Sequence, residues 1–182
     1  AIELKPDYAE VYYNLAVAFN DLGQHEEAIT SCSKAIELKP DYAEAYYNFG
    51  NALNGLGKYE EAITHYNKAI ELKPDYAEAH NNLGNTLGGH GKSEGAIDSY
   101  DKAIELRPDY AEAYNNMGIV LNELGKHEDA IAYYNKAIEL KPDYVKPYSN
   151  LGNVLNELGK YEEASVILGR AIDLQPTLAE PY

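Results

Sequence analysis

A repeat of 34 residues is the feature that most constrains how this 182-residue chain can fold. The hexapeptide Ala-Ile-Glu-Leu-Lys-Pro, with Arg for Lys in one copy and a looser final copy, ends at a proline each time: Pro6, Pro40, Pro74, Pro108, Pro142 and Pro176. A period of this length is typical of solenoids, whose single units cannot bury their apolar faces alone. We therefore expect function to reside in an extended surface and not in an enclosed catalytic pocket.

The repeats define one predicted solenoid domain over residues 1–182. Positions 1 to 34 are counted from the residue after each Pro-Asp-Tyr. The predicted segments are the end of a preceding repeat (1–8), repeats 1 to 5 (9–42, 43–76, 77–110, 111–144 and 145–178) and the start of a next repeat (179–182). Because the chain opens and stops inside a repeat and has no initial Met, we expect it to be a piece of a longer array.

Each repeat contains two segments with the apolar periodicity of an amphipathic helix. In repeat 2, Tyr46 and Leu53 fall on one arc of the first segment when residues are placed at 100° intervals. Gly57 then supplies a residue that can end a helix in the left-handed conformation, and Pro74 ends the second segment. Asp41 and its equivalents have the spacing of a capping box and are predicted to cap the first helices. The fold class is therefore predicted to be all-α.

The pattern of repeat 2 resembles the tetratricopeptide repeat, with Tyr where that family usually has Trp. The residues that carry the resemblance are Tyr46, Phe49, Gly50, Leu53, Gly57, Ala62, Tyr66, Ala69 and Pro74. The resemblance covers essentially the whole chain. It implies a right-handed α-solenoid, or superhelix, of antiparallel helix pairs whose first helices line a concave groove. It also implies a protein-protein interaction module without catalytic activity of its own.

Asparagine is unusually frequent on the face of the first helix that lies opposite the apolar stripe. It occupies position 6 in all five repeats and position 9 in three: Asn14, Asn48, Asn82, Asn116 and Asn150, then Asn51, Asn85 and Asn153. Asn disfavours a helix by about half a kcal/mol or more relative to Ala. A carboxamide offers both hydrogen-bond donors and an acceptor, which suits the backbone of an extended peptide. These residues are the candidate peptide-binding side chains.

Two interpretations of the asparagines remain open. One is ligand contact, which we favour at position 6, where the pattern resembles the asparagine ladder of O-linked N-acetylglucosamine transferases. The other is local bonding to a neighbouring helix, which we favour at positions 9 and 12. Tyr13 and Tyr47 at position 5 are candidate anchors for a ligand, but packing within their own repeat is an equal alternative.

Composition limits the partners. With a net charge of −15 and a pI near 4.6, the chain is not expected to bind nucleic acid or anionic membranes. Glutamates at position 2, including Glu10 and Glu44, favour a neutral or basic ligand over an acidic one. The histidines lack metal-ligand spacing, and Cys32 is expected to be a buried apolar residue. We expect no metal, no cofactor and no catalytic residues.

The favoured function is a scaffold that binds an extended protein segment in its concave groove. One alternative is the substrate-recognition arm of a glycosyltransferase of the O-linked N-acetylglucosamine transferase type, with its catalytic domain outside this chain. Another is a structural array that self-associates end to end. A cytoplasmic location is expected. Repeat 3, with Gly88, Gly89 and Gly95, is expected to be the softest unit, and Val166 and Ile167 suggest a covered surface on repeat 5.

Overall fold

The computed structural model describes residues 7–174, and the regular structure within them is entirely helical. This confirms the predicted all-α class. The ten helices of the described residues are α1 (Asp7–Asp21), α2 (His25–Leu38), α3 (Ala43–Gly55), α4 (Tyr59–Leu72), α5 (Ala77–Gly88), α6 (Ser93–Leu106), α7 (Ala111–Glu123), α8 (His127–Leu140), α9 (Val145–Glu157) and α10 (Tyr161–Leu174).

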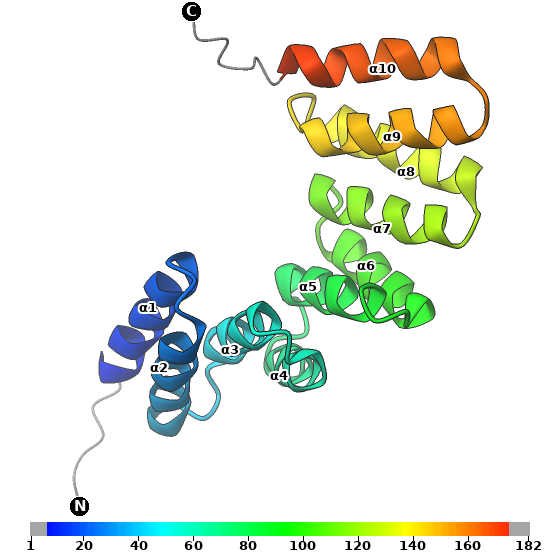
Figure 1. Ribbon diagram of the computed structural model, residues 1–182. Coiled ribbons are helices and arrows are strands. Elements are labelled where there is room, and N and C mark those ends of the chain that lie inside the picture. The colour runs from blue at the N-terminus through cyan, green and yellow to red at the C-terminus, as the bar shows by residue number, and fades with distance from the viewer. Residues whose placement is uncertain (1–6, 175–182) are drawn as a thin grey trace, which may run out of the picture. The chain divides into compact units, whose positions relative to one another are not determined.

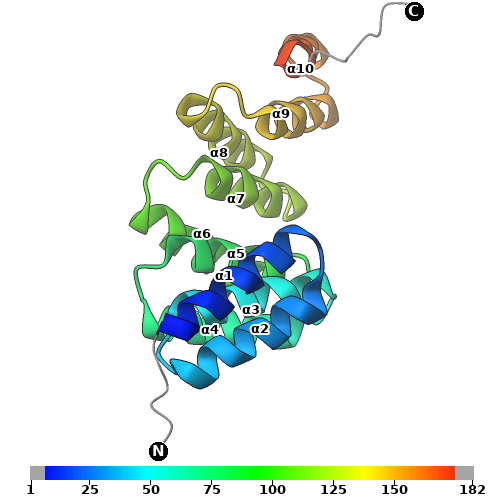
Figure 2. The ribbon, with the colours of Figure 1, turned by 90° about the vertical axis from the view of Figure 1, so that its left-hand side faces the viewer.

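The chain divides into two compact units, Ala1–Leu106 and Arg107–Tyr182, called unit 1 and unit 2 here. In unit 1, α1 packs on α2, α3 on α4 and α5 on α6 (Figure 1). The pairs are joined because α2 also contacts α3 and α4 also contacts α5. Figure 2 shows α1 and α2 side by side in a view turned by 90°. In unit 2, the pairs α7–α8 and α9–α10 are joined in the same way through α8 and α9. Each second helix thus packs on its own first helix and on the next one within its unit.

Glycine ends the first helix of every repeat, as predicted. The five residues at position 15 have positive φ angles of 70 to 74°: Gly23, Gly57, Gly91, Gly125 and Gly159. In repeat 2, the N–H of Lys58 donates to the carbonyl of Leu53 at 2.9 Å, and the N–H of Gly57 donates to the carbonyl of Asn54 at 3.0 Å. These bonds satisfy carbonyls that the helix end would leave unpaired, so the turn is tight and the second helix folds back on the first.

The core is built from alanines and matched pairs of small and large residues. Tyr66 of α4 is 1% exposed, and its ring lies so close to Gly50 of α3 that a Cβ there would be 2.6 Å from a ring carbon. Repeat 1 has the smaller Cys32 at the tyrosine position and Ala16 at the glycine position, both fully buried. The prediction that Cys32 is a small buried residue is confirmed. Repeat 1 therefore has a methyl group at Ala16 where Gly50 has none, and it lacks the tyrosine ring that would contact that methyl group. The two differences compensate in volume, as close packing requires.

The predicted aspartate caps are wrong. The N-cap residues of four first helices are tyrosines, and none forms a side-chain capping bond: Tyr42, Tyr76, Tyr110 and Tyr144. The ring of Tyr42 is 8% exposed and lies 5.1 Å from that of Tyr13, with Nζ of Lys39 at 4.4 Å from its centroid. Burial of this ring fixes the tyrosine at the junction, so Asp41 falls one residue outside the capping position.

Repeats 3 and 5 depart from the others. Helix α5 ends at Gly88 and has 12 residues, one fewer than α3, α7 or α9. In repeat 5, Pro147 is the third residue of α9, where its missing N–H has no partner to lose. Val166 on α10 is 73% exposed, whereas Ile167 is half-buried. The sequence predicted a covered surface at Val166 and Ile167. Among the described residues, none covers Val166.

Candidate functional site

The structure divides the candidate asparagines by exposure. Asn14, Asn85 and Asn153 are exposed, whereas Asn48 is buried, with 8% of its surface accessible. The remaining candidates are half-buried: Asn51, Asn82, Asn116 and Asn150. The position 6 side chains are therefore not equivalent, although the sequence repeats the same residue at each site. A ligand in solvent has direct access to Asn14 and little access to Asn48.

In unit 1, four side chains from three helices form a hydrogen-bonded group that we call the Tyr–Asn cluster: Tyr47 and Asn51 of α3, Tyr66 of α4 and Asn82 of α5. Nδ2 of Asn82 donates to the hydroxyl of Tyr47 at 3.0 Å and to Oδ1 of Asn51 at 2.9 Å. The hydroxyl of Tyr66 donates to the same Oδ1 at 2.9 Å. Because Asn82 belongs to repeat 3 and its partners to repeat 2, the cluster links consecutive repeats.

The hydrogen bonds of the Tyr–Asn cluster leave one lone pair on Oδ1 of Asn82 unused. Both hydrogens of its Nδ2 are used, whereas Oδ1 accepts one bond, from Nδ2 of Asn81 at 3.2 Å. A carboxamide oxygen has two lone pairs, so one remains for a further donor such as a peptide N–H. The fixed Nδ2 bonds also hold the amide in a single orientation, which lowers the entropic cost of using that oxygen.

Burial shapes the chemistry of the two position 5 tyrosines. Burial raises the pKa of Tyr47, and hydrogen bonds with Asn51 and Asn82 offset part of that rise. The pKa of Tyr13 is also raised, first by burial and then by the charge of Glu44. Both phenols therefore stay neutral at physiological pH. The Tyr47 ring also lies 4.9 Å from that of Tyr76, and each position 5 tyrosine thus packs against a junction tyrosine of its own repeat.

Asn48 and Asn20 both donate hydrogen bonds to backbone carbonyls of the protein itself. Nδ2 of Asn48 donates to the carbonyl of Glu44 one turn earlier, at 3.0 Å. Nδ2 of Asn20 at position 12 donates to the backbone carbonyl of Asn48 in the next repeat, also at 3.0 Å. In these two places asparagine bonds the protein's own backbone: Asn48 bonds within its own helix α3, whereas Asn20 links repeat 1 to repeat 2.

Unit 2 has a smaller polar group. Nδ2 of Asn150 donates to Oδ1 of Asn115 at 2.9 Å, and Nδ2 of Asn115 donates to Oδ1 of Asn116 at 3.2 Å. Asn115 is only 1% exposed, whereas Asn153 is exposed on the same helix as Asn150. Position 5 residues here are polar instead of aromatic, so unit 2 offers amides without an adjacent phenol.

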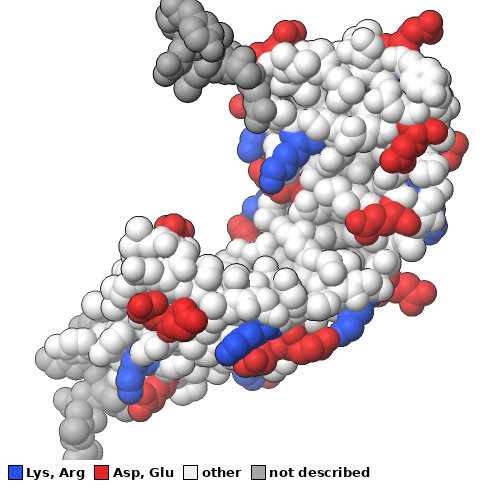
Figure 3. Space-filling model, in the orientation of Figure 1, with Lys and Arg blue, Asp and Glu red and all other residues white. Residues whose placement is uncertain are grey.

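The charges near position 2 differ from the expectation of an acidic row. Glu44 forms an ion pair with Lys73 at 2.9 Å, and Glu112 pairs with Lys141 at 3.1 Å. Burial tends to raise the pKa of Glu44, but the hydrogen bond and charge of Lys73 outweigh it and the pKa is lowered. These carboxylates are therefore largely balanced by their own repeats. Figure 3 likewise shows blue and red side chains interspersed over each unit on the face in view.

Sequence reasoning missed the basic residue before each proline. Lys73 both pairs with Glu44 and lies over the Tyr76 ring, with Nζ 4.6 Å from its centroid. Lys39, Arg107 and Lys141 lie over their junction tyrosines at 4.4, 4.5 and 5.4 Å. The recurring spacing of a basic residue three places before a tyrosine was the available signal, since a turn at the intervening proline brings the two together.

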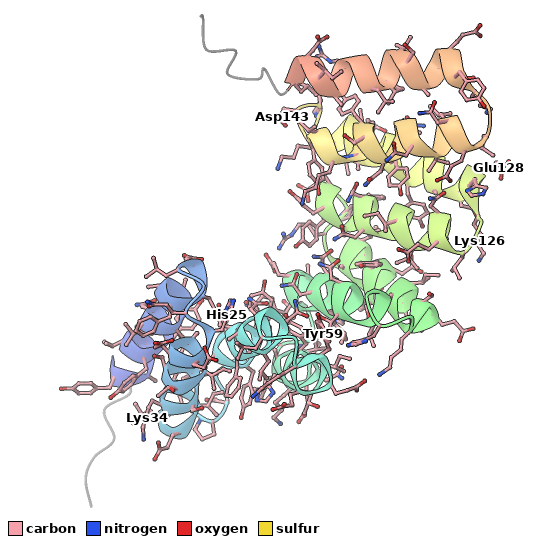
Figure 4. The ribbon with its side chains drawn as sticks, viewed as in Figure 1. His25, Lys34, Tyr59, Lys126, Glu128 and Asp143 are labelled. Carbon is pink, nitrogen blue, oxygen red and sulfur yellow. The ribbon has the colours of Figure 1, made fainter. Side chains whose placement is uncertain are left out.

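Over residues 7–174, no group of three or more His, Cys, Asp and Glu side chains is arranged to hold a metal ion. None of the described helices combines the length and apolarity needed to cross a bilayer. His25, labelled in Figure 4, has a packing role. Its ring lies against Gly55 of α3, and its Nδ1 is 3.4 Å from Oδ1 of Asn20.

Known proteins resemble the chain along most of its length. Sequence profiles described as "TPR repeat" match residues 17–57, 50–91 and 90–125. Profiles described as "Tetratricopeptide repeat" match residues 111–144, and residues 1–30 and 133–164. A comparison with curated proteins gives no match.

Solved structures share the fold. A MamA structure is 27% identical with a TM-score of 0.79, covering 92% of this chain and 98% of its own. YrrB, described as a TPR protein with an unusual peptide-binding site, is 28% identical with a TM-score of 0.73, covering 98% and 92%. Pseudomonas aeruginosa PilF, 21% identical with a TM-score of 0.86, covers 92% and 76% and supports the fold alone. Together, the 34-residue helix pairs, the glycine turns and these matches show that the chain belongs to the tetratricopeptide-repeat family.

Proposed function

We propose that this chain is a protein-protein interaction scaffold whose unit 1 binds an extended peptide along the first helices α1, α3 and α5. The binding side chains are Asn14 and Tyr13 of repeat 1 together with Asn51, Tyr47 and Asn82 of the Tyr–Asn cluster. Asn85, one turn beyond Asn82, extends the same face. Members of the family generally bind other proteins through their helix-pair repeats. Specific to this chain are the extended peptide ligand and the face formed by α1, α3 and α5.

The orientation of Asn82 is the observation that carries the proposal. Its Nδ2 is fixed by two bonds, at 2.9 and 3.0 Å, and its Oδ1 retains a lone pair on a half-buried surface. Extended peptides expose backbone N–H groups in regular succession, and each can donate to such an oxygen. The Tyr47 ring beside it adds a stiff apolar surface with a polar end.

The relatives support peptide binding in general terms. YrrB, at 28% identity, is described as having a peptide-binding site, and it matches 98% of this chain. This likeness supports a peptide ligand here without identifying the residues that contact it. Asn116, Asn150 and Asn153 of unit 2 are proposed as weaker contacts, because they lack an adjacent position 5 tyrosine.

We propose a neutral or basic ligand. The support is the net charge of −15, which favours the approach of basic segments at low ionic strength. The position 2 glutamates add less support, since two of them, Glu44 and Glu112, are paired with lysines. A cytoplasmic location and the glycosyltransferase-arm alternative both stay predictions.

Selection of extended peptides from a random library on the wild-type chain tests the function. The selected peptide is then titrated against Asn82→Ala and Asn14→Ala. Loss of one hydrogen bond of about 1 kcal/mol predicts affinity weakened about fivefold for Asn82→Ala. Asn67→Ala is the matched control, because Asn67 is exposed on the second helix α4.

Circular dichroism first checks that the variants retain wild-type helix content. Three binding results then test the assigned site and the proposed function. Weaker binding by Asn82→Ala with no change in Asn67→Ala supports the proposal. Equal affinity of wild type and Asn82→Ala contradicts the assigned site. Failure of the library to yield any binding peptide contradicts the proposed function itself.

A further inference from the structure

The helices of unit 2 enclose a mostly apolar groove. Helix α9 contacts both α8 and α10, and it lies between them in Figure 1. The second helices α8 and α10, which are described along their whole length, do not contact each other. The groove between them has a volume of about 310 Å³. Five of its lining residues are aliphatic: Ile131 of α8, Leu151 and Leu155 of α9, and Val166 and Ile167 of α10.

The sequence of repeat 5 keeps this groove free of aromatic rings. At the equivalent place in unit 1, between α2 and α4, the rings of Phe49 and His65 stack with their centroids 4.1 Å apart. Repeat 5 has Leu151 and Ile167 at these two positions, so no ring pair occupies the space there. The α8–α10 groove therefore has aliphatic walls where its counterpart in unit 1 is filled by a phenyl ring and an imidazole.

The exposure of Val166 is a property of its position in the repeat. Position 22 is also exposed in Thr30, Thr64 and Ala132, and each of these belongs to a repeat that is followed by another within the same unit. Val166 is 73% exposed in the same way. What distinguishes repeat 5 is the aliphatic side chain at this exposed position. Such a side chain adds little to the core of its own repeat, so its apolar surface is available to a partner.

Two polar residues complete the groove, and one of them is charged. Glu163 of α10 and Asn135 of α8 both line it and are exposed. No Lys, Arg or His among residues 7–174 forms an ion pair with Glu163. An apolar wall beside an unpaired carboxylate complements a segment that carries both aliphatic and basic side chains.

We propose that the α8–α10 groove binds a short segment of a partner protein that carries aliphatic side chains and a Lys or Arg. The aliphatic side chains contact Val166 and Ile167, and the basic side chain pairs with Glu163. A second copy of this chain is not the assigned occupant, because two copies that each carry a net charge of −15 repel each other. The same charge opposes an anionic membrane surface. Because this groove lies in unit 2, the inference does not rest on the peptide site proposed for unit 1.

A random peptide library tests the proposal. The library is first depleted on the Val166→Asp variant and then selected on the wild-type chain, so peptides that bind unit 1 are removed in the first step. Val166 is 73% exposed, so the substitution leaves the fold intact, and circular dichroism checks this. The recovered peptides are expected to be enriched in Leu, Ile or Val together with Lys or Arg.

Titration of a recovered peptide then measures each contribution. Loss of the apolar contact predicts affinity weakened about tenfold or more in Val166→Asp. Loss of the exposed ion pair predicts affinity weakened by up to about fivefold in Glu163→Gln. Thr64→Asp is the matched control, because it makes the same change at the equivalent exposed position of α4, and it is expected to leave the affinity unchanged.

Three outcomes overturn the proposal. Failure to enrich any peptide after depletion rules out the groove as a binding site for a protein segment. Recovered peptides without Lys or Arg, with equal affinity for wild type and Glu163→Gln, contradict the assigned chemistry of the partner. A wild-type mass that rises above 20.2 kDa with concentration in light scattering, while Val166→Asp stays at 20.2 kDa, identifies a second copy as the occupant.

Discussion

Nδ2 of Asn82 lies 2.9 Å from Oδ1 of Asn51, a residue 31 positions earlier in the chain. This bond joins two repeats through side chains that the sequence marked only as candidates for a ligand. In the same cluster Tyr47 accepts a second bond from Asn82 at 3.0 Å. Asn82 thus forms structural bonds through its nitrogen, while its oxygen accepts one bond from Asn81 and has a second lone pair, which is the atom that the proposed ligand would contact.

The bond between Asn82 and Tyr47 should contribute to stability. Asn82→Ala, Tyr47→Phe and the double variant form a thermodynamic cycle for chemical denaturation. We expect a coupling free energy of about 0.5 to 1.5 kcal/mol, the net range for one hydrogen bond. A coupling indistinguishable from zero would show that the bond does not persist in solution.

Gly50 and Gly169 should respond oppositely to replacement by alanine. A Cβ at Gly50 would lie 2.6 Å from the Tyr66 ring, so Gly50→Ala is expected to lower the free energy of unfolding by about 1 to 3 kcal/mol. At Gly169 of α10 nothing lies within 4 Å, and Gly169→Ala is expected to raise it by up to about 1 kcal/mol. Thermal or urea denaturation measures both free energies of unfolding. Equal changes in the two variants would contradict the close packing of Gly50 against Tyr66.

Repeat 3 should open before the other repeats. Glycines Gly88 and Gly89 end α5, and Gly95 lies in the first turn of α6, where each helical glycine costs up to about 1 kcal/mol relative to Ala. Hydrogen exchange is expected to be fastest around residues 86–96, and Gly89→Ala is expected to slow it there. Uniform protection across the described helices would show that these glycines do not weaken the repeat.

The thiol of Cys32 should be unreactive in the folded protein. Burial raises its pKa from 9.0 to about 12, so the native state holds the proton more tightly than the unfolded chain. The associated stability is fully present below about pH 9 and is lost as pH rises through about 12. A thiol reagent at pH 8 is expected to react only at the rate at which α2 opens. Rapid labelling of the native chain would contradict the buried position.

Much of the fold could be predicted because its determinants are local and repeated. The helix pairs follow from apolar periodicity, and the turns follow from glycines such as Gly57, whose φ of 74° is unfavourable for other residues. The Asp41 cap failed because burial of Tyr42, a tertiary contact, decided which residue takes the N-cap. The capping-box pattern carries no information about that contact.

The candidate site was less predictable than the fold. A helical wheel places Asn48 and Asn14 identically, yet one is buried and the other exposed, because only the packing of neighbouring repeats distinguishes them. The pairing of Lys73 with Glu44 spans 29 residues and depends on how the second helix returns to the first. Such contacts between helices determine the net charge around the position 2 glutamates. The residue pattern of one helix alone does not reveal them.

The side-chain amide signals of asparagine in ¹⁵N–¹H NMR spectra test the central claim most directly. On addition of a library-selected peptide, we predict that the signals of Asn14, Asn51 and Asn82 shift in a saturable way, while that of Asn67 on α4 does not move. Shifts confined to second-helix residues such as Asn67, with Asn82 unmoved at saturation, would contradict a binding face on α1, α3 and α5.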